Sequence, residues 1–290
     1  MPPSIPRLVL HVGIHKTGTT TLQVSLKKLR RQLHERGVAL ITIEMMKKLP
    51  HERSWAARRT RNRLEAPLFQ HELRNLVEKE MAQVQAVSGA PTQQVLISNE
   101  RLVGARMPSE GDAPKFRPVA EASITEVMKA LSPGEVHLAM YTRRQDRLIE
   151  SCYLWEIQKG LTHGVRDQFP YIDEPVLRYY DLAKRLKAIE GVDSMRIRPF
   201  EMISGGSLLY LDDFLSNVGL QGELDLAEFG SEPSANRSYS GKALDIALQA
   251  NSVLETKDER DRMRKFLKRA FPVGEYSSAK ILSDEQRAKL

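Results

Sequence analysis

The sequence predicts an α/β fold, with a mostly parallel central sheet flanked by helices on both faces and a helix-rich C-terminal half. Two observations predict it. Short apolar runs of strand length alternate with longer segments whose apolar residues recur at helical spacing. From residue 146 onward, helical segments follow one another with one further strand-like run. Such alternation is typical of parallel strands joined by helices, and ligands of these sheets bind at the carboxyl ends of the strands.

Five strands are predicted from the apolar runs. The first, residues 8–12, is short and apolar and ends at a glycine, which indicates a buried strand. The fourth is entered through the turn Ser132-Pro133-Gly134. The remaining predicted strands cover residues 38–42, 95–98, 135–142 and 194–198.

Helices are predicted between and after these strands. Residues 20–36 form one predicted helix, because four leucines recur at helical spacing and a glycine follows at position 37. Further helices are predicted over residues 66–87, 119–131, 146–159, 175–189, 208–218, 241–254 and 258–270. The C-terminal ILSDEQRAKL reads as the start of another amphipathic helix, where the chain either ends or is cut short. Without repeats or Gly/Ser linkers, one domain over residues 1–290 is expected.

Composition restricts the class of protein. The single cysteine, Cys152, excludes an internal disulfide and a Cys-rich zinc site, which fits a reducing cytoplasm. The first apolar run is too short for a secretory signal or a membrane span, so a cytoplasmic chain without a transmembrane segment is expected. A formal charge of +7 favours an anionic partner.

The stretch HVGIHKTGTTTLQ, residues 11–23, has the spacing of a phosphate-binding loop, with four residues between Gly13 and Gly18. Between a strand and a helix, such a loop presents backbone N–H groups to an anion. A Walker A loop has Lys-Ser or Lys-Thr after its last glycine, whereas Thr19 and Thr20 stand here and the lysine lies earlier, at Lys16. No predicted strand ends in an aspartate for magnesium. The loop therefore suits a donor whose leaving group is a phosphate and whose transferred group carries less charge.

The segment HKTGTTTLQ resembles the 5′-phosphosulfate loop of the PAPS-dependent sulfotransferases, especially the bacterial and Golgi-type branch that reads Lys-Thr-Gly-Thr-Thr. The resemblance implies a P-loop NTPase-like three-layer fold, 3′-phosphoadenosine 5′-phosphosulfate (PAPS) as the donor and adenosine 3′,5′-bisphosphate (PAP) as the product. It assigns Lys16 to the bridging oxygen and the departing phosphate. The implied donor-binding residues of this loop are His15, Lys16, Thr17, Gly18, Thr19, Thr20 and Thr21.

A second motif of that family pairs an arginine at the end of a strand with a serine two helical turns later, both binding the donor's 3′-phosphate. YTRRQDRLIESCYLW contains such a pair in Arg143 and Ser151. Arg144 is the alternative arginine, but the eight-residue spacing matches the family from Arg143. The two motifs cover some two dozen residues, and the resemblance is vague from about residue 170 onward.

Sulfuryl transfer to an alcohol requires a general base. Glu100 is the first candidate, because it follows the predicted strand 95–98 at the place where related enzymes carry a histidine or another base. Glu44 and His51 are alternatives after the second strand, where Golgi-type relatives carry a glutamate. His15 is expected to shape the loop instead. No cluster of metal ligands stands at metal-binding spacing, so no metal requirement is expected.

The leading hypothesis is a sulfotransferase that moves a sulfuryl group from PAPS to a hydroxyl of a carbohydrate or glycolipid by in-line displacement. One alternative is a P-loop kinase or NTPase, which needs magnesium and a lysine after Gly18. Another is a non-catalytic protein that binds polyanions or nucleic acid, although no nucleic-acid-binding signature is present and no nucleic-acid partner is expected. Arg237 and Lys242, at the entry of a predicted helix, either contact the donor or acceptor or are solvated. The arginines between residues 58 and 63 either meet an acidic acceptor or are solvated.

Overall fold

The computed structural model describes residues 4–50, 66–104, 119–169, 177–227, 229 and 238–290. The chain divides into two compact units. Unit 1 contains the sheet and comprises Met1–Arg106, Phe116–Thr142 and Tyr179–Glu232. Unit 2 is largely helical in its described part and comprises Met107–Lys115, Arg143–Arg178 and Pro233–Leu290. The single domain expected over residues 1–290 stays a prediction.

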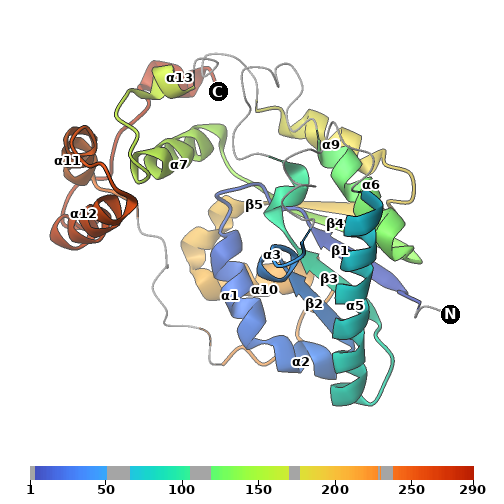
Figure 1. Cartoon of the computed structure of the whole chain (residues 1–290). Helices are drawn as coiled ribbons and strands as arrows, with labels where there is room; N and C mark the ends of the chain where they lie inside the picture. Colours follow the sequence, from blue (N-terminus) through green and yellow to red (C-terminus); the bar gives the residue numbers. More distant parts are fainter. Residues whose placement is uncertain (1–3, 51–65, 105–118, 170–176, 228, 230–237) are drawn as a thin grey trace. The chain divides into compact units, whose positions relative to one another are not determined.

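Unit 1 contains a five-stranded sheet in the order β2-β3-β1-β4-β5, and every pairing is parallel (Figure 1). The predicted parallel α/β sheet is therefore confirmed, and the predicted strand ends differ from the observed ones by at most one residue. In register, His11 and Thr42 both lie beside Ser98, so three strands end together. The strands are β1 Arg7–His11, β2 Val38–Thr42, β3 Gln94–Ser98, β4 Glu135–Thr142 and β5 Ser194–Pro199.

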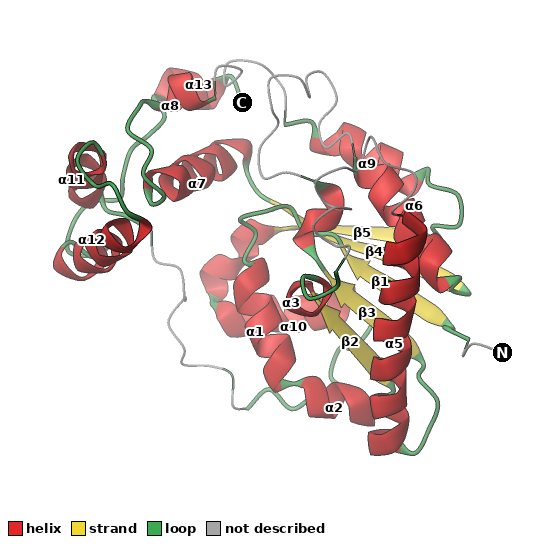
Figure 2. Cartoon of the chain, in the orientation of Figure 1, coloured by secondary structure: helices red, strands yellow, loops and turns green. Residues whose placement is uncertain are grey.

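Helices cover both faces of this sheet (Figure 2). Alternate strand residues point to opposite faces. On one face Val9, Leu40 and Leu96 pack in a buried cluster with α1, α2 and α10. Their strand neighbours, such as Leu10 and Ile97, are fully buried on the other face. The helices of unit 1 are α1 Thr19–Lys28, α2 Arg30–Glu35, α3 Ile43–Met46, α5 Ala66–Ser88, α6 Ala120–Leu131, α9 Tyr179–Lys187 and α10 Ser207–Asn217, with 3-10 turns η1 Glu100–Val103 and η3 Phe200–Gly205.

The prediction of one continuous helix over residues 20–36 is wrong, because the segment forms two helices, α1 and α2. The segment divides at Leu29, which ends α1 and begins α2. All four leucines are nevertheless buried in the same core cluster, because they stay on one face across the break. No glycine or proline marks the division, so the sequence pattern predicted the buried face and not the break.

Unit 2 is built around α7 Gln145–Ile157. Helix α11 contacts both α7 and α12, and the side-chain amide of Asn251 donates to the carbonyls of Ile157 at 2.7 Å and Leu161 at 2.9 Å. The short α13 matches the helix start expected near the C-terminus. The other helices of this unit are α8 Val165–Gln168, α11 Gly241–Asn251, α12 Lys257–Ala270 and α13 Asp284–Ala288.

Candidate functional site

The loop between β1 and α1 leaves the sheet from its middle strand. The N–H of Val12 donates to the carbonyl of Ala139 at 3.0 Å, and the N–H of Asn99 donates to the carbonyl of His11 at 3.1 Å. These bonds continue the strand pairing on both sides of β1. The loop therefore starts at a fixed point on the carboxyl edge of the sheet, where parallel α/β sheets bind ligands.

Two residues with left-handed backbones shape this loop. Lys16 has a φ of 71° and Gly18 a φ of 69°. For a residue with a side chain this conformation costs roughly 1–3 kcal/mol, and strained residues of this kind cluster at ligand-binding sites. The Lys16 side chain is half-buried. The lysine that stands ahead of Gly18 is thus held in a specific, unfavourable backbone conformation.

Buried contacts hold the loop in this shape. The hydroxyl of Thr17 donates to the carbonyl of Ile14 at 2.5 Å, and the hydroxyl of Tyr210 donates to the carbonyl of Thr17 at 2.7 Å. A Cβ atom added to Gly18 would lie 2.6 Å from Phe200. The Thr17 hydroxyl proton is therefore used inside the loop.

The N-terminus of α1 supplies hydrogen-bond donors next to the loop. The first helical bond runs from the N–H of Leu22 to the carbonyl of Gly18, at 3.1 Å. The N–H groups of Thr19, Thr20 and Thr21 precede it, and the first three N–H groups of a helix have no acceptor within the helix. No residue in the first turn is acidic. The helix dipole and these donors together favour an anion here.

His11 lies beneath the loop. Burial lowers the pKa of His11 to about 3, so the ring is neutral near pH 7. Its Nδ1 lies 2.9 Å from the hydroxyl of Ser98, while Nε2 has no hydrogen-bond partner within the described residues. A Cβ atom at Gly13 would lie 2.9 Å from that Nε2. Position 13 therefore needs a glycine because the loop passes directly over the imidazole.

The structure brings Glu100 close to α1. Its Oε2 accepts a hydrogen bond from the side-chain amide of Gln23 at 3.3 Å. The same amide donates to the carbonyl of Ser98 at 3.2 Å. Gln23 is buried and thereby ties the end of β3 to the helix that follows the loop. Glu100 is half-buried and opens η1, directly after the strand end.

The alternative bases have other surroundings. Nε2 of His15 lies 3.1 Å from the carbonyl of Gly104, and because a carbonyl only accepts, this nitrogen carries the proton. The geometry agrees with a loop-shaping role. Glu44 is exposed and bonded to Lys27, and that hydrogen bond and charge lower the pKa of Glu44, which weakens it as a base. His51 lies outside the described residues.

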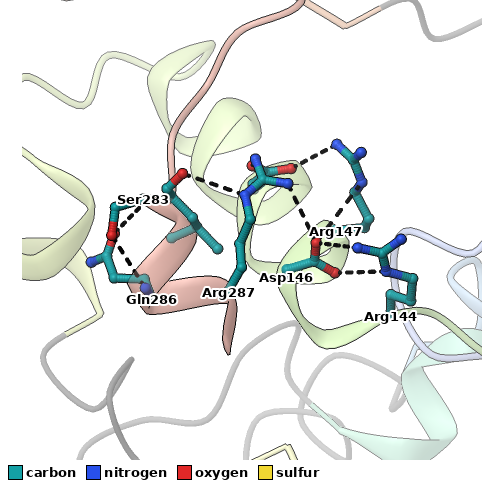
Figure 3. A network of polar contacts seen from close by, with 8 residues as sticks. Arg144, Asp146, Arg147, Ser283, Gln286 and Arg287 are labelled. Atoms are coloured by element: carbon teal, nitrogen blue, oxygen red, sulfur yellow. Dashed lines mark hydrogen bonds and ion pairs between the residues drawn. The ribbon is translucent and has the colours of Figure 1, made fainter. Parts of the chain in front are cut away.

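In unit 2, Arg143 directly follows the end of β4 and Ser151 lies on α7, both half-buried. Arg144 forms a two-point contact with Asp146, through Nε to Oδ1 at 3.1 Å and Nη2 to Oδ2 at 2.8 Å (Figure 3). The arginine that rivals Arg143 is therefore engaged by a carboxylate. The loop and Glu100 belong to unit 1, so their combination with Arg143 and Ser151 in one site is a proposal.

The remaining predicted features are Lys242, Arg237 and the arginines between residues 58 and 63. The ammonium of Lys242 lies 5.1 Å from the ring centroid of Phe271 and 5.5 Å from that of Tyr276. Arg237 and the arginines between residues 58 and 63 lie outside the described part of the chain. Within that part, no group of His, Cys, Asp or Glu side chains is placed to hold a metal. Nor is any described helix both long and apolar enough to cross a membrane.

Sequence reasoning missed Gln23, Tyr210 and His11. Gln23 ends the quoted motif, but its pairing with residues 98 and 100 depends on how the strands are ordered. Tyr210 lies 193 residues from Thr17 and gives no local signal. His11 does give a local signal, because it is a polar residue at the end of an apolar strand, two positions before a glycine.

No protein-family model and no curated protein sequence matches the chain. Among solved structures, the crystal structure of a sulfotransferase from Alicyclobacillus acidocaldarius resembles it at a TM-score of 0.43 and 15% sequence identity. The alignment covers 89% of this chain and 94% of the other. A likeness this weak carries no argument about activity, which has to come from the chain's own residues.

Proposed function

We propose that the chain is a sulfotransferase that moves a sulfuryl group from PAPS to a hydroxyl of a carbohydrate or glycolipid. The loop between β1 and α1 carries the proposal. Its lysine stands ahead of Gly18 with a left-handed backbone, and three threonines open α1 without an acid in the first turn. These donors fit a phosphosulfate, whereas the Lys-Ser or Lys-Thr pair that serves a magnesium-bound triphosphate is missing.

In the proposed reaction the acceptor oxygen attacks sulfur in line with the bond from sulfur to the bridging oxygen. That bond breaks, PAP leaves with its electron pair, and the hydroxyl proton passes to Glu100. The ammonium of Lys16 and the N–H groups at the start of α1 stabilise negative charge on the departing phosphate. This charge grows in the transition state, so these groups contribute to rate as well as to binding.

The surroundings of Glu100 support its role as the base. Gln23 donates to Oε2, which orients the carboxylate at the end of β3. A carboxylate has about four acceptor positions, so one such bond leaves capacity for the proton of an acceptor hydroxyl. The half-buried side chain lies at the ligand-binding edge of the sheet.

Arg143 and Ser151 are proposed to bind the 3′-phosphate of the donor. Arg143 is favoured over its neighbour because its eight-residue spacing to Ser151 matches the arginine–serine motif that the sulfotransferases resembled by this chain use for the 3′-phosphate. A guanidinium and a hydroxyl are suitable donors for a phosphate. PAPS carries a phosphate at its 5′ position and another at its 3′ position, whereas ATP and AMP have no 3′-phosphate. Binding of the 3′-phosphate by Arg143 and Ser151 would therefore distinguish PAPS from ATP and from AMP.

The test is incubation of the full chain with PAPS carrying a labelled sulfuryl group and a panel of glycans, glycolipids and small alcohols. We expect label in one acceptor class and release of PAP. Magnesium-dependent transfer of a phosphoryl group from ATP to an acceptor would instead establish the kinase alternative. Salt-sensitive binding of nucleic acid that PAP does not disturb would indicate the polyanion-binding alternative.

A further inference from the structure

Helix α7 begins with two buried carboxylates on one face. Asp146 is 5% exposed and Glu150, one turn later, is 6% exposed. Buried carboxylates are costly unless they are paired. Three arginines approach them, as Figure 3 shows: Arg144, Arg147 and Arg287.

Arg287 differs from the other two arginines because it comes from a distant part of the chain. It donates through Nη2 to Oε1 of Glu150 at 2.6 Å, and its Nη1 lies 3.6 Å from Oδ2 of Asp146. Its side chain is 25% exposed, against 61% for Arg144 and 48% for Arg147. Solvent therefore screens the contacts of Arg287 least.

The segment around α13 fixes Arg287 in this position. Ser283 and Gln286 form a reciprocal capping pair, with bonds of 2.8 Å and 3.2 Å. The Nε of Arg287 donates to the carbonyl of Leu282 at 3.4 Å, and Leu282 is itself buried. The guanidinium is thus held on both carboxylates by local structure.

The carboxylates adjoin the residues that we assign to the 3′-phosphate. Asp146 lies three residues after Arg143, and Glu150 directly precedes Ser151. Burial raises the pKa of Asp146, but hydrogen bonds from Arg144 and Arg147 and the charges of these arginines together lower it below its usual value, so this group is charged near neutral pH. A phosphate that carries nearly two negative charges is repelled by a neighbouring carboxylate whose charge is not compensated.

We infer that Arg287 is a positioning residue for the 3′-phosphate site, which makes the C-terminal helix part of donor recognition. Arg144 and Arg147 balance the charges of Asp146 and Glu150, and Arg287 adds the positive charge that makes the cluster attractive to a phosphate on Arg143 and Ser151. With Arg287 the cluster of three arginines and two carboxylates has a net charge of +1, and without it the net charge is zero. The inference rests on the proposed function.

Calorimetric titration of the full chain with PAP and with AMP measures how much affinity the 3′-phosphate adds. Arg287→Ala is expected to weaken PAP binding roughly three- to tenfold, because a partly screened positive charge beside the proposed 3′-phosphate site is lost. AMP binding should change less than about twofold. Arg287→Lys should retain most of the preference for PAP. Lys289→Ala removes a positive charge from the same end of the chain, where Lys289 pairs with exposed Glu285, and should leave the preference unchanged.

Removal of the carboxylate charge that Arg287 pairs with should rescue the effect. In Arg287→Ala/Glu150→Gln the preference for PAP should return, whereas a purely structural role of Arg287 would weaken both ligands equally and would not be rescued. If Arg287→Ala alone does not fold, the double variant decides, and a lost preference there contradicts the inference. A folded Arg287→Ala with the wild-type preference also contradicts it. A wild-type chain that binds PAP and AMP equally would instead overturn the proposed 3′-phosphate site, and the inference with it.

Discussion

Replacement of Gly18 by alanine tests how the structure holds the phosphate-binding loop. Gly18 has a φ of 69° and precedes α1. A Cβ atom there would lie 2.6 Å from Cε2 of Phe200 and 3.1 Å from Cε1 of Tyr210. These two rings pack edge to face with centroids 5.5 Å apart, and Tyr210 also bonds the loop at Thr17. The new methyl group would therefore displace the side chains that support the loop.

The cost of this substitution has two parts. An L-residue in the left-handed region costs about 1–2 kcal/mol, and overpacking of a buried contact costs about 1–3 kcal/mol. The two parts sum to roughly 2–5 kcal/mol for Gly18→Ala. Gly222→Ala is a matched control, because Gly222 has a φ of 70° and no atom lies within 4 Å of its added Cβ. Gly222→Ala should therefore lose only the free energy that an L-residue costs in the left-handed region.

Urea unfolding of both variants measures the difference. We expect Gly18→Ala to lose about 1–3 kcal/mol more free energy of unfolding than Gly222→Ala, and to bind PAP more weakly while the control binds normally. Equal losses in the two variants would refute the conclusion that Phe200 and Tyr210 set the shape of the loop.

Four further predictions follow from the site. Glu100→Gln should lower single-turnover sulfuryl transfer about 10²–10⁴-fold with PAP affinity nearly unchanged, while Glu44→Gln stays close to wild type; near-normal turnover of Glu100→Gln would remove it from the mechanism. Arg143→Ala should erase the preference for PAP over AMP, at about 1.5–3 kcal/mol for a charge-assisted contact, and a retained preference would exclude Arg143. EDTA should leave transfer intact because no Walker lysine and hydroxyl pair is present for magnesium; rescue of a chelated enzyme by magnesium would contradict this. Because the folded pKa of His11 is about 3 and an unfolded histidine titrates near 6.5, the unfolded state gains a proton first, so stability falls as the pH drops below about 6.5. An NMR titration that shows His11 charging near pH 6 would contradict its burial.

The sequence predicted most of the fold because periodicity reports burial. The five strands and the major helices follow from apolar runs and leucine spacing, which depend on neighbours within a few residues. The break at Leu29 has no glycine, proline or capping signal, so nothing local predicts it. The 3-10 turn at Glu100 was also missed, although Asn99 caps it by accepting from the N–H of Arg101 at 2.9 Å.

The strand ends and the loop that carry the proposed site could be predicted for the same reason. The positions of Lys16, Gly18 and Glu100 follow from strand ends, which the sequence marks. The contacts of Tyr210 and Arg287 do not follow from strand ends, because their partners lie 193 and 137 residues away along the chain. Such contacts depend on tertiary packing and leave no spacing in the sequence.

The loop between β1 and α1 is proposed to bind PAPS and not a nucleoside triphosphate. Calorimetric titration of the wild-type chain with PAP and with ATP, in the presence and absence of magnesium, tests it most directly. We expect PAP to bind at least about tenfold more tightly than ATP, because PAP offers a phosphate to each of the two proposed anion sites, and we expect magnesium to have no effect. Equal or tighter binding of ATP that requires magnesium would show that the loop binds a nucleoside triphosphate instead.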